Sequence, residues 1–250
     1  MNITVTLLSF AVLGFAAAPL LIFFLNRMPD KCFCDYDETP NESHQAPRFF
    51  FKKEGWICGL LLSGSFVLLA ERFLLAAKDL RVYFIVVLAG LFLATLVMIA
   101  LADLKFSIIP DELVIVAAIL AVIPRLASRY GGQSLFEYLG VPVLGALVGA
   151  GLILAINLIG RLIYKKDALG MGDLKLMAAC GILCGPTWII VAFLIGVLAA
   201  GICFAIFMVA GKMSGDQYRP LGPFLVFGVL FTICCQPTIQ AFINWYLSLL

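Results

Sequence analysis

Long, nearly uninterrupted apolar stretches are the feature that most restricts how this 250-residue chain can fold. A helix needs about 20 apolar residues to cross the roughly 30 Å hydrocarbon core of a bilayer. Eight stretches reach or approach that length, at residues 5–26, 56–76, 82–103, 109–124, 137–163, 173–185, 187–210 and 222–248. Their unbroken character does not fit the alternating strands of a membrane β-barrel. The sequence therefore predicts an all-α polytopic membrane protein with about eight transmembrane helices.

The distribution of Lys and Arg between these stretches predicts how the chain crosses the membrane. Short cytoplasmic loops carry an excess of basic residues. If the N-terminus lies outside, 12 of the 17 Lys and Arg residues fall in inner loops and five at outer ends. We therefore expect both the N-terminus and the C-terminus outside, with residues 164–175 at the cytoplasmic face.

One acidic cluster lies in the sequence ALADLKFSIIPDELV, residues 100–114. Asp103 falls at the inner end of segment 82–103, where the helix dipole disfavours a carboxylate. It is either functional or a surface carboxylate near the headgroups, paired with Lys105. Asp111 and Glu112 follow Pro110, and acids at a helix start favour the dipole there. Asp111 can instead orient the loop beside a site.

A second acidic position lies in ALGMGDLKL, residues 168–176. From Asp173 to the Gly185-Pro186 turn signal is about 20 Å of helix, which places Asp173 at or just below the inner membrane surface. Acidic residues at membrane depth are rare and usually functional. The alternative is an N-cap after a Gly-x-Gly turn, although Gly170 and Gly172 also permit close approach of backbone or substrate.

Asp103 and Asp173 are predicted at the same membrane face and at similar depth. If their helices pack side by side, the two carboxylates meet and share a proton. One carboxylate can then take a proton from water while the other protonates the scissile carbonyl. This is the chemistry of aspartyl proteases, and it requires no metal.

These motifs resemble those of the type IV prepilin peptidases, bacterial membrane aspartyl proteases of the GxGD class. The resemblance rests on Asp103 with Ile109-Pro110-Asp111, on Gly170-Met171-Gly172-Asp173 with Leu174-Lys175-Leu176, on FLNRMP at 24–29 and on RPLGPFLVFG at 219–228. It implies an endopeptidase that cleaves the basic leader of type IV prepilins or pseudopilins at the cytoplasmic face of the bacterial inner membrane. Asp103 and Asp173 would be catalytic, and Gly170, Gly172, Lys175, Pro110 and Asp111 would support them or bind substrate.

The resemblance also implies a division of the chain into two parts. Residues 1–76 would form an N-terminal helix pair with a cytoplasmic loop at 27–55, a possible reduced methyltransferase region. Residues 77–250 would form a six-helix GxGD peptidase core. FLNRMP is either part of a methyltransferase site or a helix end with a basic anchor. Proteolysis would need no cofactor, whereas methylation of the new N-terminus would need S-adenosylmethionine.

The cysteines of the first inner loop depart from the family pattern. Bifunctional members often carry two CxxC pairs there, which bind zinc. Here Cys32, Cys34 and the distant His44 could supply three ligands, which falls short of a closed four-ligand site unless Asp35 or Asp37 completes it. We predict no metal site, and this departure bears on methylation more than on proteolysis.

The loop also carries the basic residues Arg48, Lys52 and Lys53 around an aromatic run. The sequence favours an interfacial segment in which they anchor the chain to anionic headgroups. We therefore expect the partners of the protein to be a prepilin or pseudopilin and membrane lipid, and no nucleic acid.

Two other functions compete with proteolysis. A proton-coupled transporter would use the same two aspartates, but mid-membrane charges and repeated broken helices are typical of that class. A non-catalytic assembly factor for a secretion system would retain its function after both aspartates are neutralised.

Overall fold

The computed structural model describes residues 3–34, 45, 47–71, 80–127, 136–164, 170–211 and 220–248, and every regular element among them is helical. The α-helices are α1 (Ile3–Arg27), α2 (Trp56–Leu69), α3 (Leu80–Phe106), α4 (Asp111–Ala127), α5 (Val141–Tyr164), α6 (Met171–Val209) and α7 (Gly222–Leu247), with short helical turns η1 (Asp30–Phe33), η3 (Phe51–Gly55) and η5 (Phe136–Gly140). The all-helical class is confirmed.

Five helical spans are long and apolar enough to cross a membrane: Thr4–Arg27, Val82–Phe106, Glu137–Leu162, Met171–Val209 and Gly222–Leu247. The described part of α2 is a shorter apolar helix. Large apolar side chains remain exposed along these helices, as expected for surfaces that face lipid. The count of eight crossings and the placement of both termini outside stay predictions.

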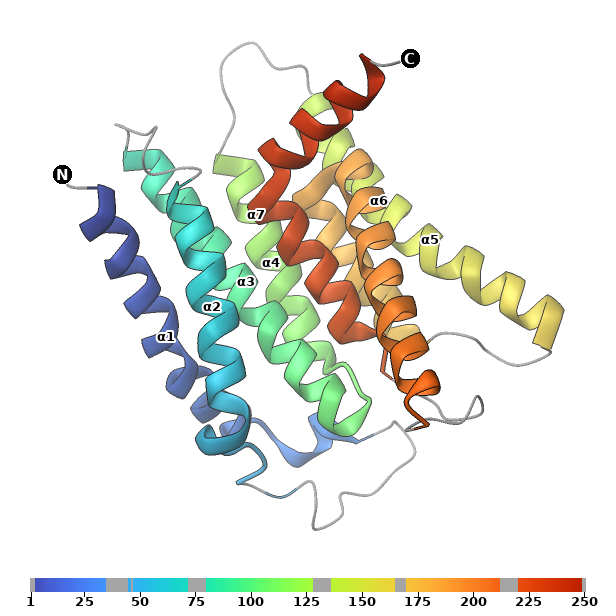
Figure 1. Ribbon diagram of the computed structural model, residues 1–250, viewed down its shortest axis with the longest axis horizontal. Helices are drawn as coiled ribbons and strands as arrows, with labels where there is room; N and C mark the ends of the chain where they lie inside the picture. Colours follow the sequence, from blue (N-terminus) through green and yellow to red (C-terminus); the bar gives the residue numbers. More distant parts are fainter. Residues whose placement is uncertain are drawn as a thin grey trace.

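Helix α3 forms the centre of the bundle (Figure 1). In the most apolar part of the span Val82–Phe106, 78% of the residues are buried. In the corresponding parts of Thr4–Arg27 and Glu137–Leu162, only 17% of the residues are buried. Helices α2, α4 and α7 pack against α3, and α1 packs mainly on α2. The end of α3 is therefore enclosed by several other elements, which matters because Asp103 lies there.

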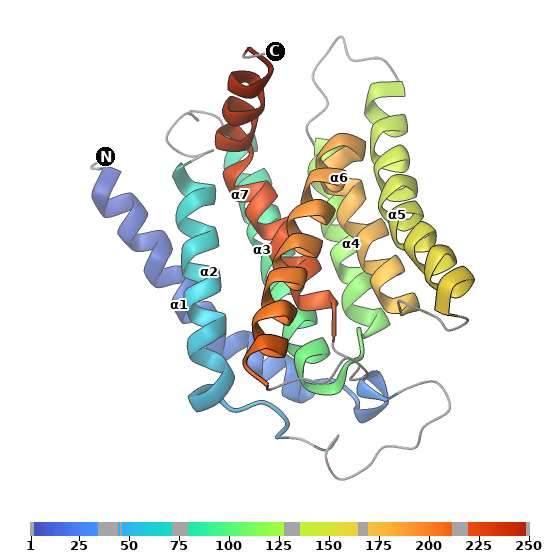
Figure 2. The same cartoon turned by 45° about the vertical axis from the view of Figure 1, so that its right-hand side comes forward.

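Helix α6 is two helical halves joined at Gly185 (Figure 2). Gly185 has a φ of 79° and a ψ of 172°, a backbone conformation that favours glycine, and the sequence predicted a turn at this position. The first half runs antiparallel to α5, because Gly145 lies against Gly181 and Gly149 lies against Met177. Small residues let these two backbones approach closely, as is common between membrane helices.

The second half of α6 runs antiparallel to α7. Gly228 lies against Ala192, and Gly196 lies against Phe224. The second half of α6 therefore passes the first turn of α7 at Gly196 and continues beyond it. The start of α6 and the start of α7 lie at the same end of the bundle.

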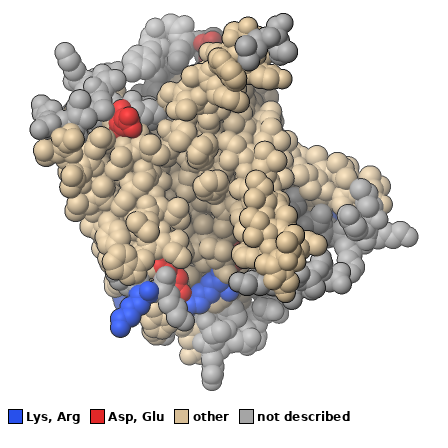
Figure 3. All heavy atoms as spheres, viewed as in Figure 1, with Lys and Arg blue, Asp and Glu red and all other residues tan. Residues whose placement is uncertain are grey.

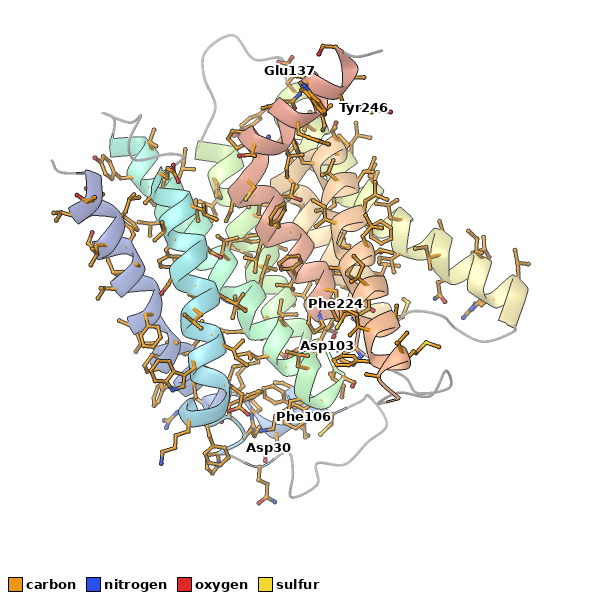
Figure 4. The ribbon with its side chains drawn as sticks, viewed as in Figure 1. Asp30, Asp103, Phe106, Glu137, Phe224 and Tyr246 are labelled. Atoms are coloured by element: carbon orange, nitrogen blue, oxygen red, sulfur yellow. The ribbon has the colours of Figure 1, made fainter. Side chains whose placement is uncertain are left out.

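Charge is concentrated at the two ends of the bundle. The visible face in Figure 3 is a broad uncharged band, with its Lys and Arg atoms near the lower margin. Asp30, Asp103, Phe106 and Phe224 lie toward that lower end, whereas Glu137 and Tyr246 lie at the opposite end (Figure 4). The first and last helices start and finish at the upper end (Figure 1).

Candidate active site

Asp103 lies in the last turn of α3 and is only 5% exposed. The helix ends at Phe106 because Ser107 adopts a left-handed backbone with a φ of 56°. The N–H of Ser107 donates to the backbone carbonyl of Asp103 at 2.8 Å. A carboxylate at the C-terminal end of its own helix is disfavoured by the dipole, so other groups are needed to stabilise its charge.

The start of α7 supplies such a group. The backbone N–H of Gly222 lies near the Asp103 carboxylate and favours its charged form, because the first amides of a helix are unpaired and carry partial positive charge. A Cβ added to Gly222 would lie 2.5 Å from Oδ2 of Asp103 and 3.1 Å from its Cγ. Gly222 is a functional candidate that sequence reasoning misses, although a Gly-Pro pair ahead of an apolar stretch is a usable signal.

Asp173 lies in the first turn of α6 and is also 5% exposed. The N-cap of this helix is Gly170, which is extended with a φ of −74° and a ψ of 151°. The alternative that Asp173 is itself the N-cap is therefore wrong. Instead the backbone N–H of Gly170 lies near its carboxylate and favours the charged form, which is the arrangement of a capping box.

The two carboxylates lie near each other at this end of the bundle. Asp103 and Asp173 are close enough for their charges to interact directly. Oδ2 of Asp103 and Oδ1 of Asp173 are buried, and neither has a hydrogen-bond partner among the described residues. Buried polar atoms are nearly always hydrogen-bonded. A shared proton, or a water molecule held between the two groups, would satisfy both oxygens.

Ile109 lies between the first turns of α6 and α7, beside this pair. A Cβ added to Gly172 would lie 3.0 Å from Cβ of Ile109, and one added to Gly222 would lie 3.4 Å from its Cδ1. Gly172 therefore allows the link between α3 and α4 to pack directly on the start of α6. This contact explains in steric terms why the loop around Asp173 is rich in glycine.

An ion pair joins the start of α4 to the first turns of α6. Nζ of Lys175 lies 2.7 and 2.8 Å from the two carboxylate oxygens of Asp111. Pro110 is buried, and its carbonyl accepts from the N–H groups of Leu113 and Val114. Both charged side chains are 40% exposed, so the pair contributes roughly 0.2–1 kcal/mol. The predicted supporting residues thus lie together beside the aspartates, and their role stays a prediction.

The described residues of the first loop do not fit a zinc site. Burial, together with a hydrogen bond and the charge of Glu112, raises the pKa of the Cys32 thiol to about 11, whereas a metal binds the thiolate. The thiol of Cys34 donates to the carbonyl of Asp30 at 3.4 Å. Within the described ranges, no three His, Cys, Asp or Glu residues are grouped as metal ligands. His44 lies outside those ranges.

One expectation for this loop is wrong. Arg48 does not extend to lipid headgroups, because it is only 3% exposed and its guanidinium donates to the carbonyls of Leu25 and Met28. Its burial depends on contacts with the end of α1, which the local sequence around Arg48 does not reveal. Lys52 is exposed, as an interfacial anchor requires.

Comparison with known proteins bears on the helices that carry both aspartates. The sequence pattern of the type IV leader peptidase family matches residues 90–206. Residues 90–206 form a type IV leader peptidase domain. This leader peptidase domain contains Asp103, Asp173 and the Lys175–Asp111 pair, whereas Gly222 lies beyond the matched residues.

Curated relatives extend the match beyond the leader peptidase domain. The chain is similar to the prepilin leader peptidase/N-methyltransferase of Bacillus subtilis, with 26% identity over 84% of this chain and 82% of that protein. It is 31% identical to the enzyme of the same name from Legionella pneumophila over 61% of this chain, which spans half of that relative's length. Leader peptidase HopD of Salmonella typhimurium is 38% identical over 32% of this chain and 53% of its own. No solved structure matches the chain.

Proposed function

We propose that this protein is a membrane aspartyl endopeptidase that cleaves the leader peptide from type IV prepilins or pseudopilins. The observation that carries this proposal is the proximity of Asp103 and Asp173, two buried carboxylates from α3 and α6 within the leader peptidase domain, whose charges interact. The names of the relatives supply the substrate class, since several are prepilin leader peptidases.

The reaction follows from the pairing of the two carboxylates. One carboxylate is ionised and removes a proton from a water molecule between the pair, while the other is protonated and donates its proton to the scissile carbonyl oxygen. The water oxygen bonds to the carbonyl carbon and forms a tetrahedral diol. Collapse of the diol breaks the C–N bond: the carboxylate that accepted the water proton passes it to the leaving amine, and a diol hydroxyl returns its proton to the other carboxylate.

The same arrangement accounts for where the leader would bind. The aspartates lie at the end of the bundle that carries the exposed Lys52 and the Lys175–Asp111 pair. The positive-inside rule assigns this end to the cytoplasm, and the substrate helix would then lie in the bilayer beside the core. We place the protein in the bacterial inner membrane with eight crossings, counting each half of α6 as one. Residues 77–250 are then the peptidase core and 1–76 an added helix pair.

Methylation of the new N-terminus is a second candidate activity, favoured by the names of the relatives. S-adenosylmethionine would supply the methyl group. Within FLNRMP, the Asn26 carboxamide is bonded to the backbone of Arg48 and Phe49, and the carbonyls of Leu25 and Met28 accept from Arg48. The Asn26 side chain and the carbonyls of Leu25 and Met28 therefore hold the loop, and these groups do not fit a binding site for this cofactor.

Reconstitution with candidate prepilins in lipid vesicles tests the proposal. Mass spectrometry should show the released leader and a pilin shortened at its N-terminus, with and without a chelator. Addition of S-adenosylmethionine to the same vesicles shows whether the new N-terminus gains a methyl group. The proposal would be rejected if the protein cleaved none of the pilins and pseudopilins that other leader peptidases process. Proton-coupled uptake into the vesicles that depends on the two aspartates would favour the transporter.

A further inference from the structure

We propose that Arg48 is a positioning residue for leader cleavage, because it holds the first inner loop against the end of α3 that carries Asp103. The inference deepens the proposed function and rests on it for its kinetic test. It assigns the N-terminal region a part in proteolysis, separate from any part in methylation.

The guanidinium of Arg48 joins four groups of the loop and of α1. It donates to the carbonyl of Leu25 at 3.1 Å, to the carbonyl of Met28 at 2.8 Å and to the carboxylate of Asp30. Its Cζ lies 4.5 Å from the centroid of the Phe33 ring. A planar guanidinium with five donors can serve several acceptors at once, which a lysine cannot do.

The backbone around Arg48 is fixed by the side chain of Asn26, at the end of α1. The N–H groups of Arg48 and Phe49 donate to Oδ1 of Asn26 at 2.8 and 2.9 Å, and Nδ2 of Asn26 donates to the carbonyl of Phe49 at 2.9 Å. Asn26 and Arg48 therefore close loop 27–55, because they join the end of α1 to a point near the other end of the loop.

This closed loop packs directly on the last turn of α3. The ring of Phe106 lies 5.3 Å from that of Phe33 and 5.9 Å from that of Phe49. Nζ of Lys105 donates to the backbone carbonyl of Arg48. Because Phe106 and Lys105 belong to the same helical turn as Asp103, the position of the loop fixes the position of that turn.

A displaced last turn of α3 would move the Asp103 carboxylate relative to Gly222 and Asp173. Reaction rates depend steeply on such geometry, whereas binding of a long membrane substrate depends on many contacts far from it. Loss of the Arg48 contacts should therefore lower kcat more than it raises KM.

The primary test is Arg48→Lys, which keeps the charge and removes the multiple bonds, in purified enzyme reconstituted with a prepilin. We expect kcat to fall by about 10- to 100-fold, since a 1 Å misplacement can cost on the order of 100-fold, with KM little changed. The pH–rate profile should also be displaced, because the surroundings of Asp103 change. A merely less stable enzyme would keep the wild-type profile at lower amplitude.

The matched control is Lys52→Met, which removes an exposed cation from the same loop and should leave kcat and the pH profile unchanged. If Arg48→Lys does not accumulate, Lys105→Met removes the contact with the Arg48 carbonyl and leaves the guanidinium bonds in place. It should produce the same displaced profile. Wild-type kcat and pH profile in Arg48→Lys, or in Lys105→Met where that variant stands in, would overturn the proposal.

Hydrogen–deuterium exchange separates this inference from the proposed function. The backbone amides of residues 103–110 should exchange faster in Arg48→Lys than in wild type or Lys52→Met, whether or not a pilin is cleaved. If the wild type cleaves no prepilin but exchange is faster, the proposed function fails while the loop contact stands. Unchanged exchange in this segment would overturn the inference itself.

Discussion

The backbone of Gly222 lies against the carboxylate of Asp103, so the first turn of α7 faces the last turn of α3. The Gly222 N–H favours the charged form of the carboxylate, and a Cβ at this position would lie 2.5 Å from Oδ2. The positive end of α7 thereby offsets the negative end of α3 around Asp103. Asp173 receives similar help from the start of α6, so each carboxylate lies beside the N-terminus of a helix, α7 for Asp103 and α6 for Asp173.

Gly222→Ala should therefore abolish most of the cleavage while the protein still inserts and folds. The added methyl group displaces the Asp103 carboxylate, and a displacement near 1 Å is enough to lower kcat by about 100-fold. Leader release from reconstituted prepilin measures this change. Gly201→Ala is the control, because a Cβ there meets nothing within 4 Å, and it should cleave normally. Normal cleavage by Gly222→Ala would show that the close contact is not required.

Ser107→Gly should make the protein more stable. Ser107 holds a φ of 56° at the end of α3, a conformation that costs a residue with a side chain about 1–2 kcal/mol. Glycine removes this cost, but it also makes the unfolded chain more flexible, which offsets part of the gain. The free energy of unfolding should therefore rise by about 0.5–1 kcal/mol. Thermal unfolding in detergent measures it. A β-branched residue should act in the opposite direction, and a Ser107→Val protein as stable as Ser107→Gly would contradict this account.

Charge reversal tests the pair formed by Asp111 and Lys175. Asp111→Lys or Lys175→Asp alone places like charges together and should lower the free energy of unfolding by about 1 kcal/mol. The double reversal should recover part of this loss and not all of it, because a lysine at the start of α4 opposes the helix dipole. Urea or thermal unfolding of the four proteins gives the coupling energy. Strictly additive losses would show that the two side chains do not interact.

Removal of metal and of the loop cysteines should leave leader cleavage intact. The Cys32 thiol, with its pKa raised to about 11 by burial and by Glu112, is protonated at neutral pH and is a poor metal ligand. We expect a Cys32→Ser, Cys34→Ser protein to retain near-normal cleavage in the presence of a chelator. An activity that is lost on chelation and returns on addition of zinc would contradict the metal-free mechanism.

The helical class and the common face of the two aspartates could be predicted from the sequence, because both depend on local patterns. Apolar stretches mark the helices, and the basic residues together with the helix lengths place Asp103 and Asp173 at one end. The nearness of Lys175 and Asp111 could also be predicted, since each residue lies close in sequence to one of the aspartates. The structure adds that the two carboxylates lie near enough for their charges to interact. That arrangement depends on α4 and α7, which each pack against both α3 and α6.

Gly222 and Arg48 show what local patterns leave out. The role of Gly222 depends on a contact between helices separated by more than 100 residues, and no spacing rule reports such a contact. Arg48 stands beside an aromatic run, which resembles an interfacial anchor. It is buried because the end of α1 and the turn after it present carbonyls, the Asp30 carboxylate and the Asn26 side chain to it.

The most direct test of the account is the mass of a pilin N-terminus after co-expression with wild type, Asp103→Asn or Asp173→Asn. The wild type should yield pilin shortened by its leader. Each variant should leave the precursor intact at an equal amount of inserted enzyme, because an amide can neither share the proton nor activate water. Near-normal processing by either variant would show that the pair of carboxylates does not carry out the cleavage.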